Sequence, residues 1–123
     1  MKTALIIEDN DNNMELITFI LEANGYATAR AENGLDGLKT ALEIKPDLII
    51  LDIQLPDIDG TIVLEEIRNS ALNQLVPVIA MTSFAMAGDR EKLMAAGCTG
   101  YIEKPIDPDR VVMQIESILE EYA

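Results

Sequence analysis

The sequence contains no histidine and only one cysteine, Cys98, among its 123 residues. Without histidine the chain cannot supply a Ser-His-Asp or Cys-His catalytic group, a histidine zinc ligand or a phosphohistidine of its own. One cysteine excludes an internal disulfide and suits a reducing compartment. We interpret Cys98 as a small buried residue rather than a reactive thiol, because free cysteines are often buried. Any metal site must use oxygen ligands, which favours Mg²⁺, Mn²⁺ or Ca²⁺.

Basic residues are scarce as well: 9 lysines and arginines stand against 22 aspartates and glutamates, for a net charge of −13. Nucleic acids and anionic membranes attract proteins through Lys and Arg, so neither is expected as a partner. We interpret the acidic surface as an aid to solubility. No apolar run approaches the roughly 20 residues of a membrane-spanning helix. The N-terminus lacks the long apolar stretch and cleavage site of a signal peptide, so a cytoplasmic location is expected.

Length and composition indicate one domain that spans residues 1–123. About half of the chain is apolar (49%), which suffices for a core and argues against disorder. The sequence has no internal repeat, low-complexity tract or Pro/Ser-rich linker. Its organisation is an alternation of short apolar runs with amphipathic segments.

Five short segments have the composition of β-strands. Three are continuous apolar runs, as expected for parallel strands that are buried on both faces. The other two are less apolar and fit the edges of a sheet. In chain order the predicted strands span residues 4–7, 26–30, 48–51, 78–81 and 99–102.

An amphipathic helix is predicted after each strand. Asp11 or Asn12 is expected to cap the first, with Glu15 in its first turn, and Asp107 to cap the last, with Pro108 following. The apolar residues that mark the five helices are Met14, Ile17 and Leu21; Leu35, Leu38 and Leu42; Leu64 and Ile67; Met86, Leu93 and Met94; and Val111, Ile115 and Ile118.

Such alternation is typical of a doubly wound α/β fold, with helices on both faces of a parallel sheet. Right-handed crossovers and two weak edge strands are satisfied by a five-stranded sheet in the order 2-1-3-4-5, the flavodoxin-like (βα)5 arrangement. Ligands of such sheets bind beyond the carboxyl ends of the strands, where the winding reverses. The site is therefore predicted between strands one and three.

Three acidic residues follow these two strands: Glu8, Asp9 and Asp52. Adjacent strand ends would bring their carboxylates together, and the mutual repulsion favours a bound divalent cation. Mg²⁺ typically combines one or two carboxylates with water and a phosphate oxygen. The alternative is three ordinary loop acids, since acidic residues are common in this chain, but their joint placement favours the metal site.

Two further polar residues, Thr82 and Lys104, follow the fourth and fifth strands. Asp52 is expected to be ionised near neutral pH and can attack phosphorus without a general base. Lys104 and the metal would offset charge on the phosphoryl oxygens, and Thr82 would donate a hydrogen bond. The pattern thus favours phosphoryl transfer to Asp52. A surface lysine and a helix-capping threonine are the alternatives, and spacing alone does not decide the role of Thr82.

Four segments together resemble the response regulator receiver domain of two-component signalling. They are Ile6–Asn10, Leu51–Gly60, Ala80–Ser83 and Tyr101–Pro105. Each is a weak signal alone, but all four occur in the family's order and spacing. The resemblance spans the whole chain.

The resemblance implies a role for each site residue. Asp52 resembles the phosphoacceptor, and Asp9 and Asp52 resemble the ligands of Mg²⁺ or Mn²⁺. Glu8 is expected to reach the ion through water, and Gln54 through its backbone carbonyl. The remaining implied roles are a switch hydroxyl at Thr82, an aromatic that follows it inward at Tyr101, a phosphate-binding lysine at Lys104 and a cis bond at Pro105.

The resemblance also implies partners. The phosphoryl donor would be a phosphohistidine on a sensor histidine kinase or a histidine phosphotransfer protein, which accounts for the missing histidine. A downstream protein would recognise the surface of the fourth helix, fifth strand and fifth helix, including Tyr101, Glu103 and Arg110. A monomer or a weak phosphorylation-linked dimer is expected. Gln54 and Phe84 occupy positions that tune phosphoryl lifetime, and we expect Phe84 to slow hydrolysis by shielding the group.

The sequence ends soon after the fifth helix, without a basic patch or second domain, so a stand-alone receiver is expected. Segments around the fourth helix are similar to single-domain cell-division regulators and to hybrid-kinase receivers. The alternative is a receiver domain excised from a larger hybrid kinase or multidomain regulator.

Three other functions fit the sequence less well. A flavin-binding protein would need a phosphate loop rich in Ser, Thr and Gly where this chain has Glu8–Asp11. An aspartate-based phosphohydrolase would need a second acid two residues after Asp52, where Gln54 stands. A calcium loop counted on Gly60 has Leu55 where a carboxylate is required. We therefore expect a signalling phosphoacceptor and not an enzyme that turns over a separate substrate.

Overall fold

The computed structural model describes residues 1–70, 75–83 and 87–122. Strands and helices alternate strictly along these residues, in agreement with the sequence pattern. The elements are β1 (Thr3–Ile7), α1 (Asp11–Ala23), β2 (Ala27–Ala31), α2 (Gly34–Ile44), β3 (Leu48–Asp52), α3 (Gly60–Asn69), β4 (Val78–Thr82), α4 (Ala87–Ala96), β5 (Gly100–Glu103) and α5 (Val111–Tyr122).

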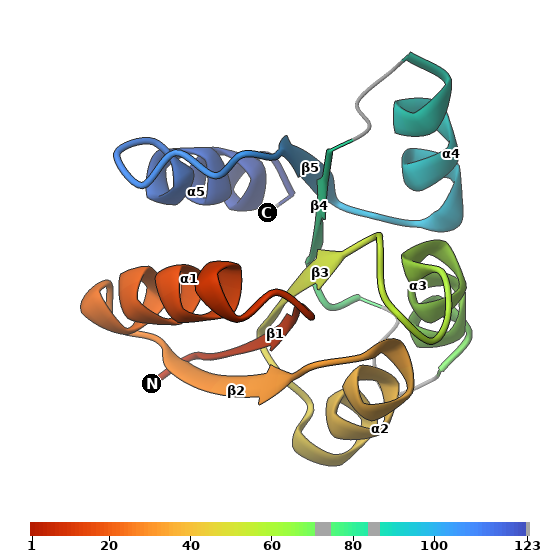
Figure 1. Cartoon of the computed structure of the whole chain (residues 1–123), viewed down its shortest axis with the longest axis horizontal. Helices are drawn as coiled ribbons and strands as arrows, with labels where there is room; N and C mark the ends of the chain where they lie inside the picture. The colour runs from red at the N-terminus through yellow and green to blue at the C-terminus, as the bar shows by residue number, and fades with distance from the viewer. Residues whose placement is uncertain (71–74, 84–86, 123) are drawn as a thin grey trace.

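The strands form one parallel sheet in the order β2-β1-β3-β4-β5, as predicted. Helices α1 and α5 cover one face, and α2, α3 and α4 cover the other (Figure 1). The two less apolar strands, β2 and β5, lie at the edges. Since every connection is a crossover helix, all strands end at the same edge of the sheet.

The core has two layers, one on each face of the sheet. Side chains of β1 alternate between them: Ala4 and Ile6 pack toward α1 and α5, while Leu5 and Ile7 pack toward α2, α3 and α4. All residues of β3 and β4 are buried, which explains their continuous apolar sequence. Within the described residues, no helix is long and apolar enough to cross a membrane.

Helix α1 begins at Asp11, one residue earlier than it could begin if Asp11 were its N-cap. Asn10 is the N-cap, and its side chain accepts a hydrogen bond of 3.0 Å from the N–H of Asn13. The prediction of Asp11 or Asn12 was therefore wrong, because the first turn already includes Asp11. Glu15 does not complete a capping box; it pairs with Arg30 of β2 at 3.0 Å.

The most deeply buried residues of helix α2 are small ones, and of its three predicted leucines Leu38 packs, partly buried, against the core. Its buried positions are Gly34, Gly37 and Ala41, whereas Leu35 is 60% and Leu42 38% exposed. Leu35 and Leu42 therefore mark the helix but not its buried face. Small residues there let the helix backbone approach the sheet closely.

The last two helices also refine the sequence prediction. In α4, Leu93 is buried but Met94 is 48% exposed, and Met86 lies outside the described residues. Helix α5 begins at Val111, later than predicted. The side chain of Asp107 accepts the N–H of Asp109, and its carbonyl accepts the N–H of Val111. Asp107 therefore closes a short turn of residues 108–110 that leads into the helix.

Two side chains occupy the amino-terminal end of the sheet, opposite the predicted site. The Arg68 guanidinium of α3 donates to the carbonyls of Gly97 (2.8 Å) and Val76 (2.6 Å), and lies 3.4 Å from the Thr99 hydroxyl. Cys98 is buried nearby, and burial raises its thiol pKa to about 11. These features support the interpretation of Cys98 as a structural residue.

Candidate functional site

Four polar side chains lie at the carboxyl ends of four neighbouring strands, β1, β3, β4 and β5. Asp52 ends β3, Glu8 directly follows β1, Thr82 ends β4 and Lys104 directly follows β5. The parallel register pairs Asp52 with Met81 and Thr82 with Glu103. Residues 96 positions apart in the chain, Glu8 and Lys104, therefore come into contact.

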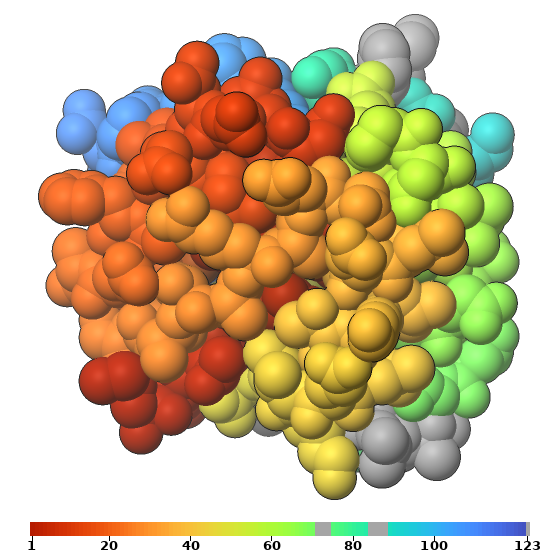
Figure 2. All heavy atoms as spheres, turned by 60° about the horizontal axis from the view of Figure 1, so that its bottom comes forward, coloured from red at the N-terminus to blue at the C-terminus, as the bar shows by residue number. Residues whose placement is uncertain are grey.

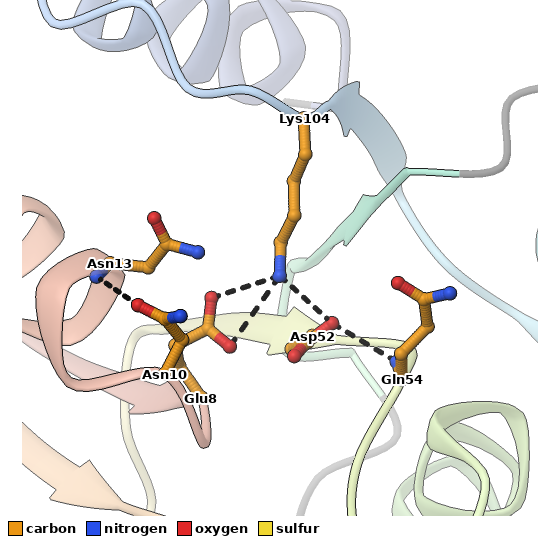
Figure 3. Close-up of polar contacts among 6 residues, drawn as sticks. All are labelled: Glu8, Asn10, Asn13, Asp52, Gln54 and Lys104. Atoms are coloured by element: carbon orange, nitrogen blue, oxygen red, sulfur yellow. Dashed lines mark hydrogen bonds and ion pairs between the residues drawn. The ribbon is translucent and has the colours of Figure 1, made fainter.

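Lys104 reaches from β5 into the space between the two buried carboxylates (Figure 3). Its Nζ lies 3.1 Å from Glu8 Oε1 and 3.2 Å from Asp52 Oδ1. The carboxylates are almost completely buried, at 2% and 3% exposure. The backbone of Lys104 is also fixed, because its N–H donates to the carbonyl of Thr82 at 2.9 Å. The peptide bond to Pro105 is cis, as the resemblance implied.

The pKa of Asp52 is raised to about 6, chiefly because burial disfavours its charged form. The hydrogen bond and negative charge of Glu8 raise it further, while the N–H of Gln54 (3.0 Å) and the charge of Lys104 lower it. For Lys104, burial lowers the pKa, but its contacts with Glu8 and Asp52 raise it overall. At neutral pH the site therefore holds an ionised aspartate beside a charged lysine.

The three predicted acidic residues do form a cluster. One carboxylate oxygen from each of Glu8, Asp9 and Asp52 lies within 4.8 Å of the other two. Asp9 is exposed, whereas Glu8 Oε1 is buried and is paired with the ammonium of Lys104 at 3.1 Å. A set of three carboxylates with an open side at Asp9 fits a hard divalent cation.

Of the remaining predicted site residues, the structure describes Thr82 and Tyr101. Thr82 is buried and lines a cleft of about 530 Å³ between the β3–α3 loop and α4. Thr82 is the last residue of β4, and Ser83 after it is not helical, so Thr82 does not cap a helix. Tyr101 is half-buried on β5, with the guanidinium carbon of Arg90 5.1 Å from its ring centroid. Phe84 lies outside the described residues.

Two acidic residues have contacts that sequence reasoning missed. Asp59 accepts the N–H of Thr61 at 2.8 Å and caps α3. Asp57 accepts the N–H groups of Gly34 (2.7 Å) and Leu35 (2.9 Å) at the start of α2. Desolvation would raise the pKa of Asp57, but these hydrogen bonds lower it overall. Asn33 and Gly34 signal a helix start, yet no local pattern signals a cap supplied from residue 57.

A five-stranded α/β sheet with this acidic cluster and lysine defines the receiver class of signalling proteins. The chain belongs to the response regulator receiver domain family, whose pattern it matches over residues 4–116. Its curated relatives include the polar-differentiation response regulator DivK of Brucella anthropi, 45% identical over 118 residues and 96% of each chain. The corresponding protein of Brucella ovis is 44% identical with the same coverage.

Solved structures agree with this assignment. The receiver domain of a Pseudomonas aeruginosa sensor histidine kinase, with magnesium coordinated in its active-site cleft, is 31% identical with a TM-score of 0.85. It is matched over 98% of this chain and 96% of its own. The chemotaxis response regulator CheY4 of Vibrio cholerae has a TM-score of 0.91 at 22% identity, over 96% of this chain and 98% of its own. That second likeness concerns the fold alone.

Proposed function

We propose that Asp52 accepts a phosphoryl group from a phosphohistidine of a partner kinase or phosphotransfer protein. The observation that carries this proposal is the environment of Asp52. It is a buried carboxylate at a strand end, in contact with Lys104 and beside the oxygens of Glu8 and Asp9. Since this chain has no histidine, the donor group must come from elsewhere.

In the proposed transfer, an oxygen of ionised Asp52 attacks phosphorus while the phosphorus–nitrogen bond to the donor imidazole breaks. The electron pair of that bond stays with the imidazole, and Asp52 becomes an acyl phosphate. Lys104 offsets negative charge on the phosphoryl oxygens, since its ammonium is already 3.2 Å from Asp52. Thr82 is assigned the hydroxyl that contacts the phosphoryl group afterward.

Glu8, Asp9 and Asp52, together with the backbone carbonyl of Gln54, are proposed to hold Mg²⁺ or Mn²⁺. When bound, the ion would offset the charge of the carboxylates and of the phosphoryl group. Glu8 is assigned a contact through water. The magnesium in the related Pseudomonas aeruginosa receiver supports this proposal.

The signal is proposed to leave the site through Thr82 and Tyr101. Phosphorylation shifts conformers only if the two states bind the phosphoryl group differently, and Thr82 supplies that difference by moving onto it. The Tyr101 ring, now beside Arg90, would follow. A downstream protein would read the change on α4, β5 and α5. The chain would act in the cytoplasm as a monomer or weak phosphorylation-linked dimer.

Two neighbouring residues are proposed to set the lifetime of the acyl phosphate. Gln54 is exposed two residues after Asp52 and offers no acid to orient water. Phe84 is expected to shield the phosphoryl group. Replacing Phe84 with Ala should speed its hydrolysis.

The coverage of DivK, 96% of both chains, favours a receiver that acts without an attached output domain. The likeness to a kinase receiver favours the alternative of a domain from a larger regulator. The proposed chemistry of Asp52 is the same in both cases.

The test is incubation with Mg²⁺ and a small acyl phosphate, followed by measurement of the intact mass. We expect a gain of one phosphoryl group in the parent protein and none without Mg²⁺. Asp52→Asn should show no gain, whereas Asp47→Asn, an acidic residue at the opposite end of β3, should behave as the parent. Addition of a phosphoryl group to Asp52→Asn would contradict the assignment.

A further inference from the structure

The loop between β3 and α3, residues 53–59, carries Gln54 and is held by a backbone N–H hydrogen bond at each of its ends. At its start, the N–H of Gln54 donates to Asp52 at 3.0 Å. At its close, the N–H of Gly60 donates to the carbonyl of Ile53 at 2.9 Å. Gly60 has no room for a side chain, because a Cβ there would lie 2.5 Å from the Ile53 Cα.

The middle of this loop is tied to a different element. Asp57 accepts the first two N–H groups of α2, from Gly34 and Leu35, across more than 20 residues of sequence. Those donors have no partner within the helix, and a carboxylate is favoured at the positive end of the helix dipole. The local cap of α2, Asn33, serves a different donor, the N–H of Asp36 at 2.8 Å.

Side-chain packing also joins the β3–α3 loop to the start of α2. Ile58 lies against Gly34, where a Cβ would come within 2.5 Å of its side chain. In the space-filling view, the orange-yellow surface of α2 borders the yellow-green surface of the β3–α3 loop and α3 (Figure 2). The hydrogen bonds of Asp57 therefore join two surfaces that are already complementary.

Helix α2 is in turn seated on the strand that delivers the other acidic residues. Gly37 lies so close to Ile7 that a Cβ would be 2.6 Å from the Ile7 side chain. Glu8 and Asp9 follow Ile7 directly. A chain of contacts thus runs from the Gln54 loop through Asp57 and α2 to the end of β1.

We propose that Asp57 is a positioning residue for divalent-cation binding, which holds the Gln54 loop in register with Glu8 and Asp9. This inference rests on the metal site of the proposed function. Asp57 is not itself a ligand of the ion. It acts by keeping the loop in its binding conformation, so that the ion does not have to order the loop when it binds.

The experiment compares Mg²⁺ affinity in four proteins, followed by the amide NMR shifts of Asp52 and its neighbours. They are the parent, Asp57→Ala, Asp57→Asn and Asn33→Ala. The Asn33→Ala variant is the matched control, because it removes a cap from the same helix end without releasing the loop. The spectra also report whether each variant is folded.

We expect Asp57→Ala to bind Mg²⁺ about tenfold more weakly, the usual scale for losing an outer-shell partner. Asn33→Ala should keep the parent affinity while losing thermal stability. Both Asp57 variants remove the same charge, but Asn keeps one acceptor oxygen. Asp57→Asn should therefore fall between the parent and Asp57→Ala.

Three results would overturn the inference: unchanged affinity in Asp57→Ala, an equal loss in Asn33→Ala, or equal losses in the two Asp57 variants. The last would assign the effect to charge instead of hydrogen bonding. A parent protein that binds no Mg²⁺ would reject the proposed metal site itself, and the positioning role with it. Unchanged affinity in Asp57→Ala beside a parent that binds would reject the positioning role alone.

Discussion

Asp52 combines burial with close neighbours of both charges. Burial is the largest influence on its pKa, and the charge of Lys104 compensates only in part. Three carboxylates and one ammonium, taken as ionised, leave two negative charges at the site. A divalent cation would balance these charges. The residues therefore carry an energetic cost that binding of the proposed ligand would relieve.

Replacing Asp52 with Asn should stabilise the metal-free protein. A folded-state pKa near 6 lies above the roughly 3.9 of an unfolded aspartate, so ionisation of Asp52 weakens folding as pH rises between these values. We expect a gain of about 1–2 kcal/mol at pH 7.5, discounted for solvent screening at the open side, and less at pH 5. Urea unfolding in a chelating buffer measures it.

The control for this prediction is Glu91→Gln, which removes one exposed acidic charge from α4. Its effect should stay within about 0.5 kcal/mol at both pH values. A gain in Asp52→Asn that matches this control, or does not depend on pH, would refute the stated cause.

At the scale of elements, helix α2 lies close to its neighbours because its most buried positions carry no large side chains. Its buried face consists of Gly34, Gly37 and Ala41, and the helix backbone lies close against Ile7 of β1. Larger residues would hold α2 away from the strand that leads to Glu8. The closeness of α2 to the sheet thus affects both stability and the site.

Gly37→Ala should destabilise the protein, although alanine is the better helix former by about 1 kcal/mol. The added Cβ would lie 2.6–2.8 Å from three atoms of a fully buried, β-branched Ile7. We expect a net loss of about 1–3 kcal/mol in the free energy of unfolding, measured with urea.

A second variant separates crowding from other causes of this loss. Ile7→Val combined with Gly37→Ala should cost less than the sum of the two single changes, because the smaller side chain makes room for the Cβ. Strict additivity would show that crowding against Ile7 is not the cause of the loss, and a stabilising Gly37→Ala would show that α2 moves away without cost.

At the scale of the whole molecule, the carboxyl end of the sheet carries the candidate site, and the amino end carries structural hydrogen bonds. The carboxyl end gathers Glu8, Asp52 and Lys104 into a cluster with unbalanced charge. At the amino end, Arg68 joins α3 to the residues before β4 and β5 through carbonyl and hydroxyl acceptors. The fold thus has a polar structural junction on the side opposite the site.

Arg68→Met should lower the free energy of unfolding by about 2–4 kcal/mol in urea titrations. It keeps the apolar stem but leaves the partly buried carbonyls of Gly97 and Val76 without their charged donor. Arg30→Met is the comparison, since that arginine forms an exposed ion pair with Glu15 and should change stability by under about 1 kcal/mol. Equal effects would show that Arg68 contributes no more than a surface charge.

Much of this architecture could be predicted from the sequence. Apolar runs such as Leu48–Leu51 predict buried parallel strands, and alternation with helices predicts the sheet order. The α1 cap and the buried face of α2 could not be read correctly. Neighbouring residues such as Asn10 and Asp11 have similar capping ability, and a leucine at helical spacing does not reveal how close the sheet lies.

The sequence by itself determined the strands, helices and family, and it placed Glu8, Asp9, Asp52, Thr82 and Lys104 at the strand ends. It could do so because hydrophobic periodicity and residue order are local properties. Only the tertiary structure decided that Asp57 caps α2 and that Arg68 joins the opposite edge. It also decided how burial and neighbouring charge set the pKa of Asp52. These contacts join residues far apart in the chain, so they depend on distances that exist only after folding.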